Sequence, residues 1–132
     1  MRRQAISFLI ATFGVAAISA SAWAHHSMSM FEDVKLVTIE GTVHSLNFRN
    51  PHIFVEVEVP TSDGKTEIWS IEGGGAAQSV NAGITAQALK VGSKVKIIAH
   101  PPKDPATRHA NMVGIESNGR YYSRGALTNI RK

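Results

Sequence analysis

The sequence contains no cysteine. This excludes disulfides, a thiolate nucleophile and an iron–sulfur cluster, so any transition metal must be held by histidine, methionine, carboxylate or backbone groups. The motifs of common enzyme classes are also missing. No glycine-rich phosphate loop is followed by lysine, and there is neither a His-Glu-x-x-His zinc motif nor a serine nucleophile elbow. We therefore expect a protein that is not an enzyme.

A strong charge of one sign is missing as well. The chain has 14 basic and 10 acidic side chains, and its net charge of +4 falls to +2 when residues 1–24, with their two arginines, are set aside. Nucleic-acid binding is typical of a clustered basic face, and no such cluster is found in the sequence. We expect no nucleic-acid partner.

Residues 1–24 have the three parts of an export signal. Two arginines begin it, the stretch 5–20 is almost wholly apolar, and small residues stand at Ala22 and Ala24. We predict a signal peptide cleaved after Ala24, which leaves 108 residues in the periplasm. Cleavage after Ala22 is an alternative. A retained membrane anchor is another, but the apolar run is short for a span of roughly 20 residues, and no stable membrane span is expected after cleavage.

Residues 25–34 are predicted to form a flexible lead-in. Cleavage after Ala24 makes its start rich in metal ligands: His25, His26, Met28 and Met30. An amino-terminal histidine chelates through its α-amine and its ring nitrogen. Copper(II) favours nitrogen-rich sites, and copper(I) favours thioethers. Amine and imidazole both lose their protons readily near neutral pH. We predict copper binding here; the alternative is a flexible leader whose composition reflects processing and solubility.

Two further histidines are candidate ligands on the folded domain. His44 is predicted on the first strand and His52 directly before the second, and a hairpin between these strands brings the two histidines towards each other. Either one could complete a metal site begun by the amino terminus. The alternative is that both are exposed polar residues on a strand face. His100 and His109 flank a proline-rich loop and are interpreted as loop residues bonded to backbone.

Hydrophobic alternation and turn residues predict an all-β domain over residues 35–122 with one short helix, followed by a polar tail at 123–132. The predicted strands are 35–48, 53–59, 67–72, 94–100, 110–116 and a short sixth at 121–122, and the helix is 76–82. The first strand changes face, which indicates a bulge or bend at Gly41 or Ser45. This layout is typical of a small Greek-key β-barrel of the oligonucleotide/oligosaccharide-binding (OB) type. A β-sandwich is the alternative.

Aromatic residues of the second and third strands offer a different function. OB barrels bind ligands on this face, where aromatic side chains act as stacking platforms. Phe54 is predicted to face outward, Trp69 is a second candidate that more often belongs to a core, and Arg49 could support an anionic ligand. The alternative function is therefore a module that binds a peptide, a glycan or a periplasmic protein partner without metal.

Several short motifs occur in an order that resembles a known family. They are His25-His26-Ser27-Met28, Gly41-Thr42-Val43, Asn50-Pro51-His52, Trp69-Ser70-Ile71-Glu72, Leu89-Lys90-Val91-Gly92 and His100-Pro101. Together they resemble a family of small exported bacterial proteins described as a domain of unknown function. The resemblance spans nearly the whole chain after residue 24 and implies a location and a fold, but no activity. The glycine run 73–75 departs from the resemblance, which leads us to expect a more varied sequence before the helix.

Overall fold

A computed structural model describes residues 29–123. The predicted export signal, His25, His26, Met28 and nearly all of the polar tail lie outside this range. The chain divides after Met30, and the second unit begins at Phe31 and holds the β-domain. Within residues 29–123, no helix has both the length and the apolar character that crossing a membrane requires.

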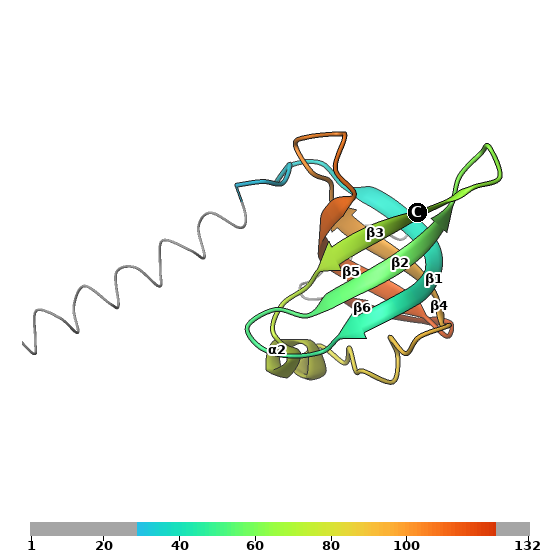
Figure 1. The fold of residues 1–132 in the computed structure, drawn as a ribbon. Helices are drawn as coiled ribbons and strands as arrows, with labels where there is room; N and C mark the ends of the chain where they lie inside the picture. Colours follow the sequence, from blue (N-terminus) through green and yellow to red (C-terminus); the bar gives the residue numbers. More distant parts are fainter. Residues whose placement is uncertain (1–28, 124–132) are drawn as a thin grey trace, which may run out of the picture. The chain divides into compact units, whose positions relative to one another are not determined.

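The described residues form six strands and one short helix (Figure 1). The elements are β1 (Val37–Asn47), β2 (Phe54–Pro60), β3 (Thr66–Glu72), α2 (Ala76–Asn81), β4 (Lys94–His100), β5 (His109–Ser117) and β6 (Arg120–Ser123). The predicted elements agree with these bounds to within a few residues. Positive φ occurs at Gly64 between β2 and β3, and at Asn118 and Gly119 between β5 and β6. The second pair forms a two-residue hairpin, in which positive φ is expected.

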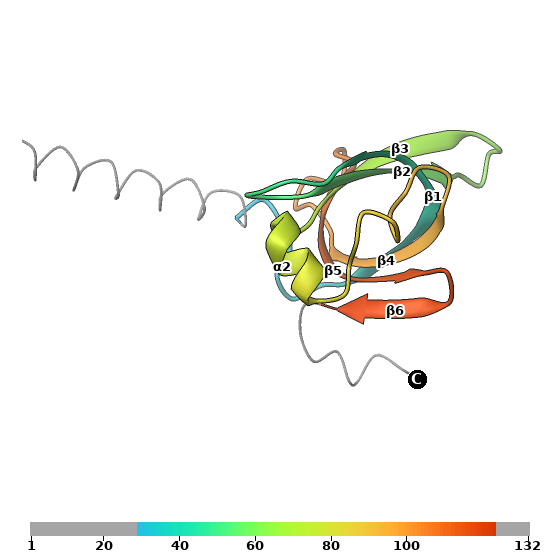
Figure 2. The same ribbon diagram turned by 90° about the horizontal axis from the view of Figure 1, so that it is seen from below.

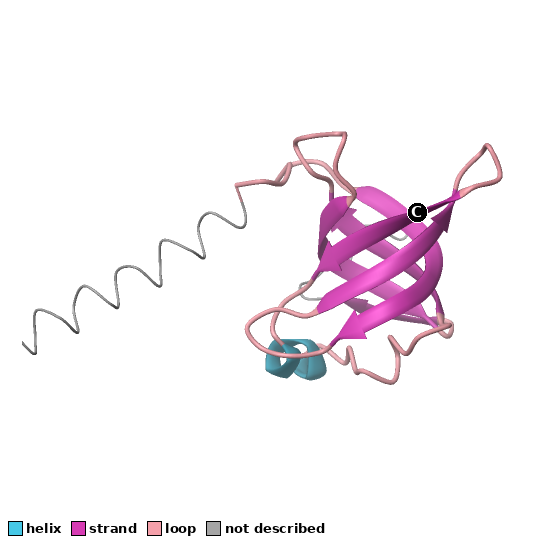
Figure 3. Ribbon diagram, in the orientation of Figure 1, coloured by secondary structure: helices cyan, strands magenta, loops and turns pink. Residues whose placement is uncertain are grey.

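The sheet closes into a barrel. Its strand order is β3-β2-β1-β4-β5-β6, and β3 also pairs with β5 in parallel. This last pairing closes a ring of five strands, with β6 added outside it (Figure 2). Strands make up the whole wall, and the helix lies at the end where β1 finishes and β2 begins (Figure 3). The predicted OB-type barrel is confirmed, and the β-sandwich alternative is set aside.

The long first strand takes part in two pairings. Its first half pairs with β4 and its second half with β2, and the β2 register shifts between Val43 and Ser45. His44 is thus the extra residue of a β-bulge, one position from the predicted Ser45. Gly41 is needed where the strand turns, because a Cβ there would overlap the backbone carbonyl oxygen of Glu58. The predicted change of face in this strand is confirmed.

Alternating side chains of every barrel strand meet inside the ring. The loop after α2 adds two fully buried side chains, Ile84 and Leu89, to this core. The other buried members are Ile39, Val43, Ile53, Val55, Val57, Ile71, Val95, Ile97, Ala99, Ala110, Met112 and Ile115. Each fully buried aliphatic side chain contributes about 1.5–3 kcal/mol, so core burial stabilises this cysteine-free domain.

Candidate functional site

The most unusual group of side chains lies outside the barrel, at the seam between β3 and β5. Ile71 and Ala110 are registered partners at this seam, and both point into the core. Because side chains alternate along a strand, the neighbouring Glu72 and His109 face outward. The side chain of Glu72 is nevertheless only 6% exposed. A carboxylate that faces away from the core is therefore buried by something else.

Aromatic rings lie around His109, the histidine beside Glu72. Phe31 is 2% exposed, and its ring meets the ring of His109 edge-on with 5.1 Å between centroids. The ring of Phe54, whose strand position is opposite Glu72, lies 6.4 Å from His109. The segment that carries Phe31 forms a β-bridge to Pro102. The carboxylate thus lies in surroundings where an ion requires partners, since an unpaired buried charge is costly.

Two imidazoles lie beside this carboxylate. Oε1 of Glu72 lies 3.2 Å from Nδ1 of His52, and Oε2 lies 3.6 Å from Nε2 of His109. The second distance exceeds that of a hydrogen bond, and Nε2 of His109 is buried without a hydrogen-bond partner. We call His52, Glu72 and His109 the Glu72 cluster.

The hydrogen bond of the His52 ring decides which of its nitrogens carries the proton. Nδ1 lies 3.2 Å from the carbonyl oxygen of Gly73 as well as 3.2 Å from Glu72. A carbonyl oxygen only accepts, so Nδ1 is the donor. In the neutral ring Nε2 then carries the lone pair, and the side chain is 43% exposed. The ring is therefore oriented through Nδ1, with its side chain partly open to solvent.

The glycine run after β3 allows this arrangement. Gly73 donates its N–H to the carbonyl of Ile53 (2.8 Å), and Ile53 donates to the carbonyl of Gly74 (3.1 Å). A Cβ at Gly73 would lie 2.6 Å from Cγ1 of Ile53, and one at Gly75 would lie 2.6 Å from Oδ1 of Asn50. A side chain at either position would force residues of the loop that carries His52 to shift. From the sequence, these glycines indicated only an interruption of the strand pattern, and their role in packing was not predicted.

The same loop also caps the helix. The backbone carbonyl of Arg49 accepts from Ala76, and the side-chain oxygen of Asn50 accepts from Ala77 at 3.4 Å. These contacts satisfy N–H groups that a helix start leaves unpaired. The side chain of Arg49, predicted to support an anionic ligand, is exposed. In this structure its backbone has the clearer role.

His100 holds the segment after Phe31 against the barrel. Its Nδ1 donates to the carbonyl oxygens of Glu32 (3.0 Å) and Lys35 (2.9 Å), and Glu32 donates its N–H to Pro101. The prediction that His100 bonds to backbone is confirmed. The same prediction for His109 is wrong, because His109 begins β5 and its ring packs in the Glu72 cluster.

His44 and His52 do not converge as predicted. His44 places Nδ1 2.8 Å from Oε1 of Glu58, a residue registered opposite Ile68. His52 contacts Glu72, which is registered opposite Phe54 at the other end of the β2–β3 ladder. The bulge and the six-residue connection between β1 and β2 separate the two imidazoles. In the described part of the chain, no three His, Asp or Glu side chains are grouped as a metal site.

The predicted aromatic face has limited open surface. Phe54 faces outward as expected, but it is half buried near His109. Trp69 packs against the core, and the guanidinium of Arg108 lies 5.5 Å from its ring centroid. Met30, the only predicted amino-terminal ligand within the described range, is 55% exposed.

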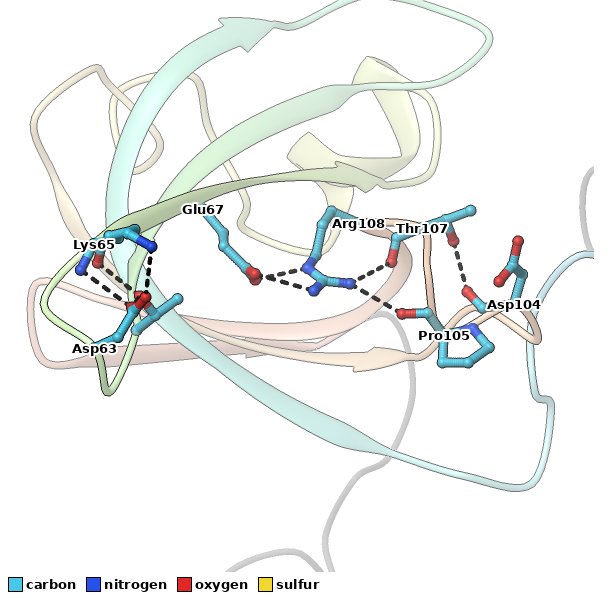
Figure 4. Close-up of polar contacts among 8 residues, drawn as sticks. Asp63, Lys65, Glu67, Asp104, Pro105, Thr107 and Arg108 are labelled. Atoms are coloured by element: carbon cyan, nitrogen blue, oxygen red, sulfur yellow. Dashed lines mark hydrogen bonds and ion pairs between the residues drawn. The ribbon is translucent and has the colours of Figure 1, made fainter.

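Arg108 was not identified from the sequence, and it makes the most complete ion pair of the described surface. Its Nε and Nη2 donate to the two carboxylate oxygens of Glu67 at 2.6 and 3.0 Å (Figure 4). Its Nη1 donates to the carbonyls of Pro105 and Thr107. Arg108 holds the pKa of Glu67 below its ordinary value, mainly through this hydrogen bonding. The pair fixes the loop before β5 beside β3.

Strand order, closure and the helix after β3 define an OB-type barrel. The chain belongs to DUF6152, a family of unknown function, whose model matches residues 12–111. This confirms the resemblance to an uncharacterised family. No curated protein matches.

Two solved structures show a likeness that concerns the fold alone. The mitochondrial single-stranded DNA binding protein Rim1 of S. cerevisiae aligns at 14% identity and a TM-score of 0.47, over 66% of this chain and 97% of that chain. The N-terminal domain of PriB from Thermoanaerobacter tencongensis aligns at 21% identity and a TM-score of 0.46, over 62% and 93%.

Proposed function

We propose that this protein is exported to the periplasm and binds copper, as a carrier or buffer rather than as an enzyme. The first donor set is the amino-terminal one: the α-amine and ring of His25, with His26, Met28 and Met30. These are the nitrogen and thioether ligands that copper prefers. His52 is the proposed ligand from the barrel.

The observation that carries the proposal is the orientation of the His52 ring, with its proton on Nδ1. Ligating histidines commonly donate their other ring N–H to a carboxylate or a backbone carbonyl. Nδ1 of His52 donates to the carbonyl of Gly73, with Oε1 of Glu72 3.2 Å from the same nitrogen. His44 has the same arrangement with Glu58. The side chains of His44 and Glu58 are both about half exposed. The His44 ring is therefore less firmly held, and we place it second to His52 as a candidate ligand.

The alternative function, a partner-binding module that uses the Phe54 face, has less support. The ring of Phe54 is partly covered, and the neighbouring outward positions of β2 hold the carboxylates Glu56 and Glu58. Carboxylates repel the phosphates of nucleic acid, which attract basic side chains. Glu56 and Glu58 therefore disfavour nucleic-acid binding on this face, and we propose no nucleic-acid partner.

The test begins with mass spectrometry of the exported protein, which determines its first residue. Copper(II) and copper(I) affinities of the processed protein are then measured by competition with chelators. A variant with one alanine inserted before His25 separates the α-amine from the imidazole, so a large loss of copper(II) affinity is expected. Unchanged affinity would rule out amine chelation. Absence of copper binding in both proteins would overturn the proposal and favour the partner-binding module.

A further inference from the structure

We infer that Nε2 of His52 is the atom through which the barrel binds the metal, and that Glu72 is the residue that positions it. The inference rests on the proposed function and gives it an atom and a supporting group. It is carried by the geometry of the Glu72 cluster, in which the carboxylate faces Nδ1 of His52 from a buried position.

The first step concerns the proton. A histidine binds a metal through an unprotonated nitrogen. The Gly73 carbonyl accepts the hydrogen bond of Nδ1, and the Glu72 carboxylate lies 3.2 Å from the same nitrogen, so both groups favour a proton there. Nε2 is left as the ligand atom without any rearrangement of the ring. Replacing Glu72 by glutamine removes the negative charge beside Nδ1 and weakens the preference for this tautomer.

The second step concerns rigidity. The Glu72 side chain is 6% exposed, and its second oxygen lies 3.6 Å from Nε2 of His109. The His109 ring in turn meets the rings of Phe31 and Phe54. Backbone hydrogen bonds between Ile53 and the glycine run fix the loop beneath His52. A ligand that is already ordered loses less conformational freedom on binding. The His52 ring is therefore a preorganised ligand.

The chain contains its own matched comparison. Glu58 is also within hydrogen-bond distance of an imidazole Nδ1, that of His44, but both partners are largely open to solvent, at 50% and 45% exposure. Exposed ion pairs are worth little and are readily replaced by water. Glu58→Gln therefore controls for loss of a carboxylate beside a histidine, without loss of a buried positioning group.

The test uses the full processed protein labelled with nitrogen-15. Long-range proton–nitrogen spectra of the metal-free protein report the tautomer of each histidine, and His52 is expected to carry its proton on Nδ1. Zinc(II) is then the diamagnetic probe, since it also binds imidazole nitrogen. Zinc is expected to shift the Nε2 resonance of His52, and the titration of that resonance yields an affinity specific to this ring. Glu72→Gln is expected to lower that affinity by about 10–100-fold, and Glu58→Gln to leave it unchanged.

The outcomes separate this inference from the proposed function. The inference is overturned if His52 carries its proton on Nε2 in the metal-free protein. It is also overturned if zinc leaves the Nε2 resonance of His52 unmoved. Both results would hold even if copper binds elsewhere. Equal losses in the two glutamine variants overturn the role of Glu72. If Glu72→Gln does not fold by circular dichroism, the tautomer and zinc measurements on the unmodified protein decide. Failure of the processed protein to bind copper overturns the proposed function, whereas the tautomer measurement is independent of it.

Discussion

Glu72 and His52 lie on separate segments, and their side chains meet with 3.2 Å between Oε1 and Nδ1. Each is the last residue of a short motif that supported the family resemblance, Trp69-Ser70-Ile71-Glu72 and Asn50-Pro51-His52. The contact explains why these two motifs belong together. One ends the strand that closes the barrel, and the other ends the loop that packs against it. The glycine run after Glu72 is the third part of the same arrangement.

Gly73→Ala tests the close approach beneath His52. The added methyl would lie 2.6 Å from Cγ1 of Ile53, so we expect a loss of about 1–3 kcal/mol in the free energy of unfolding, as for other overpacked sites. Ile53→Ala alone should cost about 2–5 kcal/mol. The double variant should cost less than the sum, because the smaller side chain leaves room for the methyl. Chemical denaturation measures all three, and strict additivity would contradict the contact.

Phe31→Ala tests whether the segment before β1 is part of the folded domain. Phe31 is 2% exposed, and removing a buried aromatic side chain costs about 3 kcal/mol or more. Val34→Ala is the control in the same segment. Val34 is 85% exposed, so its loss should change stability by less than about 0.5 kcal/mol. Similar denaturation midpoints for the two variants would show that Phe31 is not held against His109.

The pair of Arg108 and Glu67 predicts a pH dependence. The lowered pKa of Glu67 in the folded state means that its contribution to stability is complete above the ordinary glutamate pKa. That contribution is lost as the pH falls through the lowered value. In Arg108→Met the carboxyl pKa should return towards the ordinary value, as followed by NMR titration. Lys96→Met, which removes a lysine paired with Glu40 instead, should leave Glu67 unaffected. No change in Arg108→Met would contradict the pairing.

Tyr121 predicts the opposite dependence at alkaline pH. Burial raises the pKa of its phenol, since burial disfavours the charged form. The corresponding stability is present below the ordinary tyrosine pKa and is lost as the pH rises through the raised value. The unfolding free energy of the unmodified protein should therefore fall more steeply with alkaline pH than that of Tyr121→Phe. Parallel curves would show that the phenol is as accessible in the folded as in the unfolded state.

Much of the fold follows from local patterns. Alternation predicts the inward row Ile53, Val55 and Val57, because a half-buried strand has a period of two. The Asp63-Gly64 and Asn118-Gly119 turns are visible because their backbone conformations require particular residues. The change of parity in the first strand predicts its bend, since a bulge moves later side chains to the other face. These features depend on neighbours in the sequence.

Other features depend on residues that are far apart along the chain. Phe31 lies in a segment expected to be a flexible lead-in, and only its contact with His109 and the bridge to Pro102 show it to be buried. Arg108 was not predicted, because nothing near it in the sequence indicates that it forms an ion pair with Glu67. His44 and His52 were expected together because a simple hairpin places them so, and the register of β1 with β2 separates them.

The sequence by itself determined the number and order of strands, the position of the helix and the absence of cysteine chemistry, because local periodicity and composition control these properties. The tertiary structure decided that an outward-facing carboxylate, Glu72, is buried between two imidazoles. Closure of the barrel through the parallel pairing of β3 with β5 brings His109 beside Glu72. That closure joins distant segments, and no local pattern encodes which charged side chain the seam will enclose.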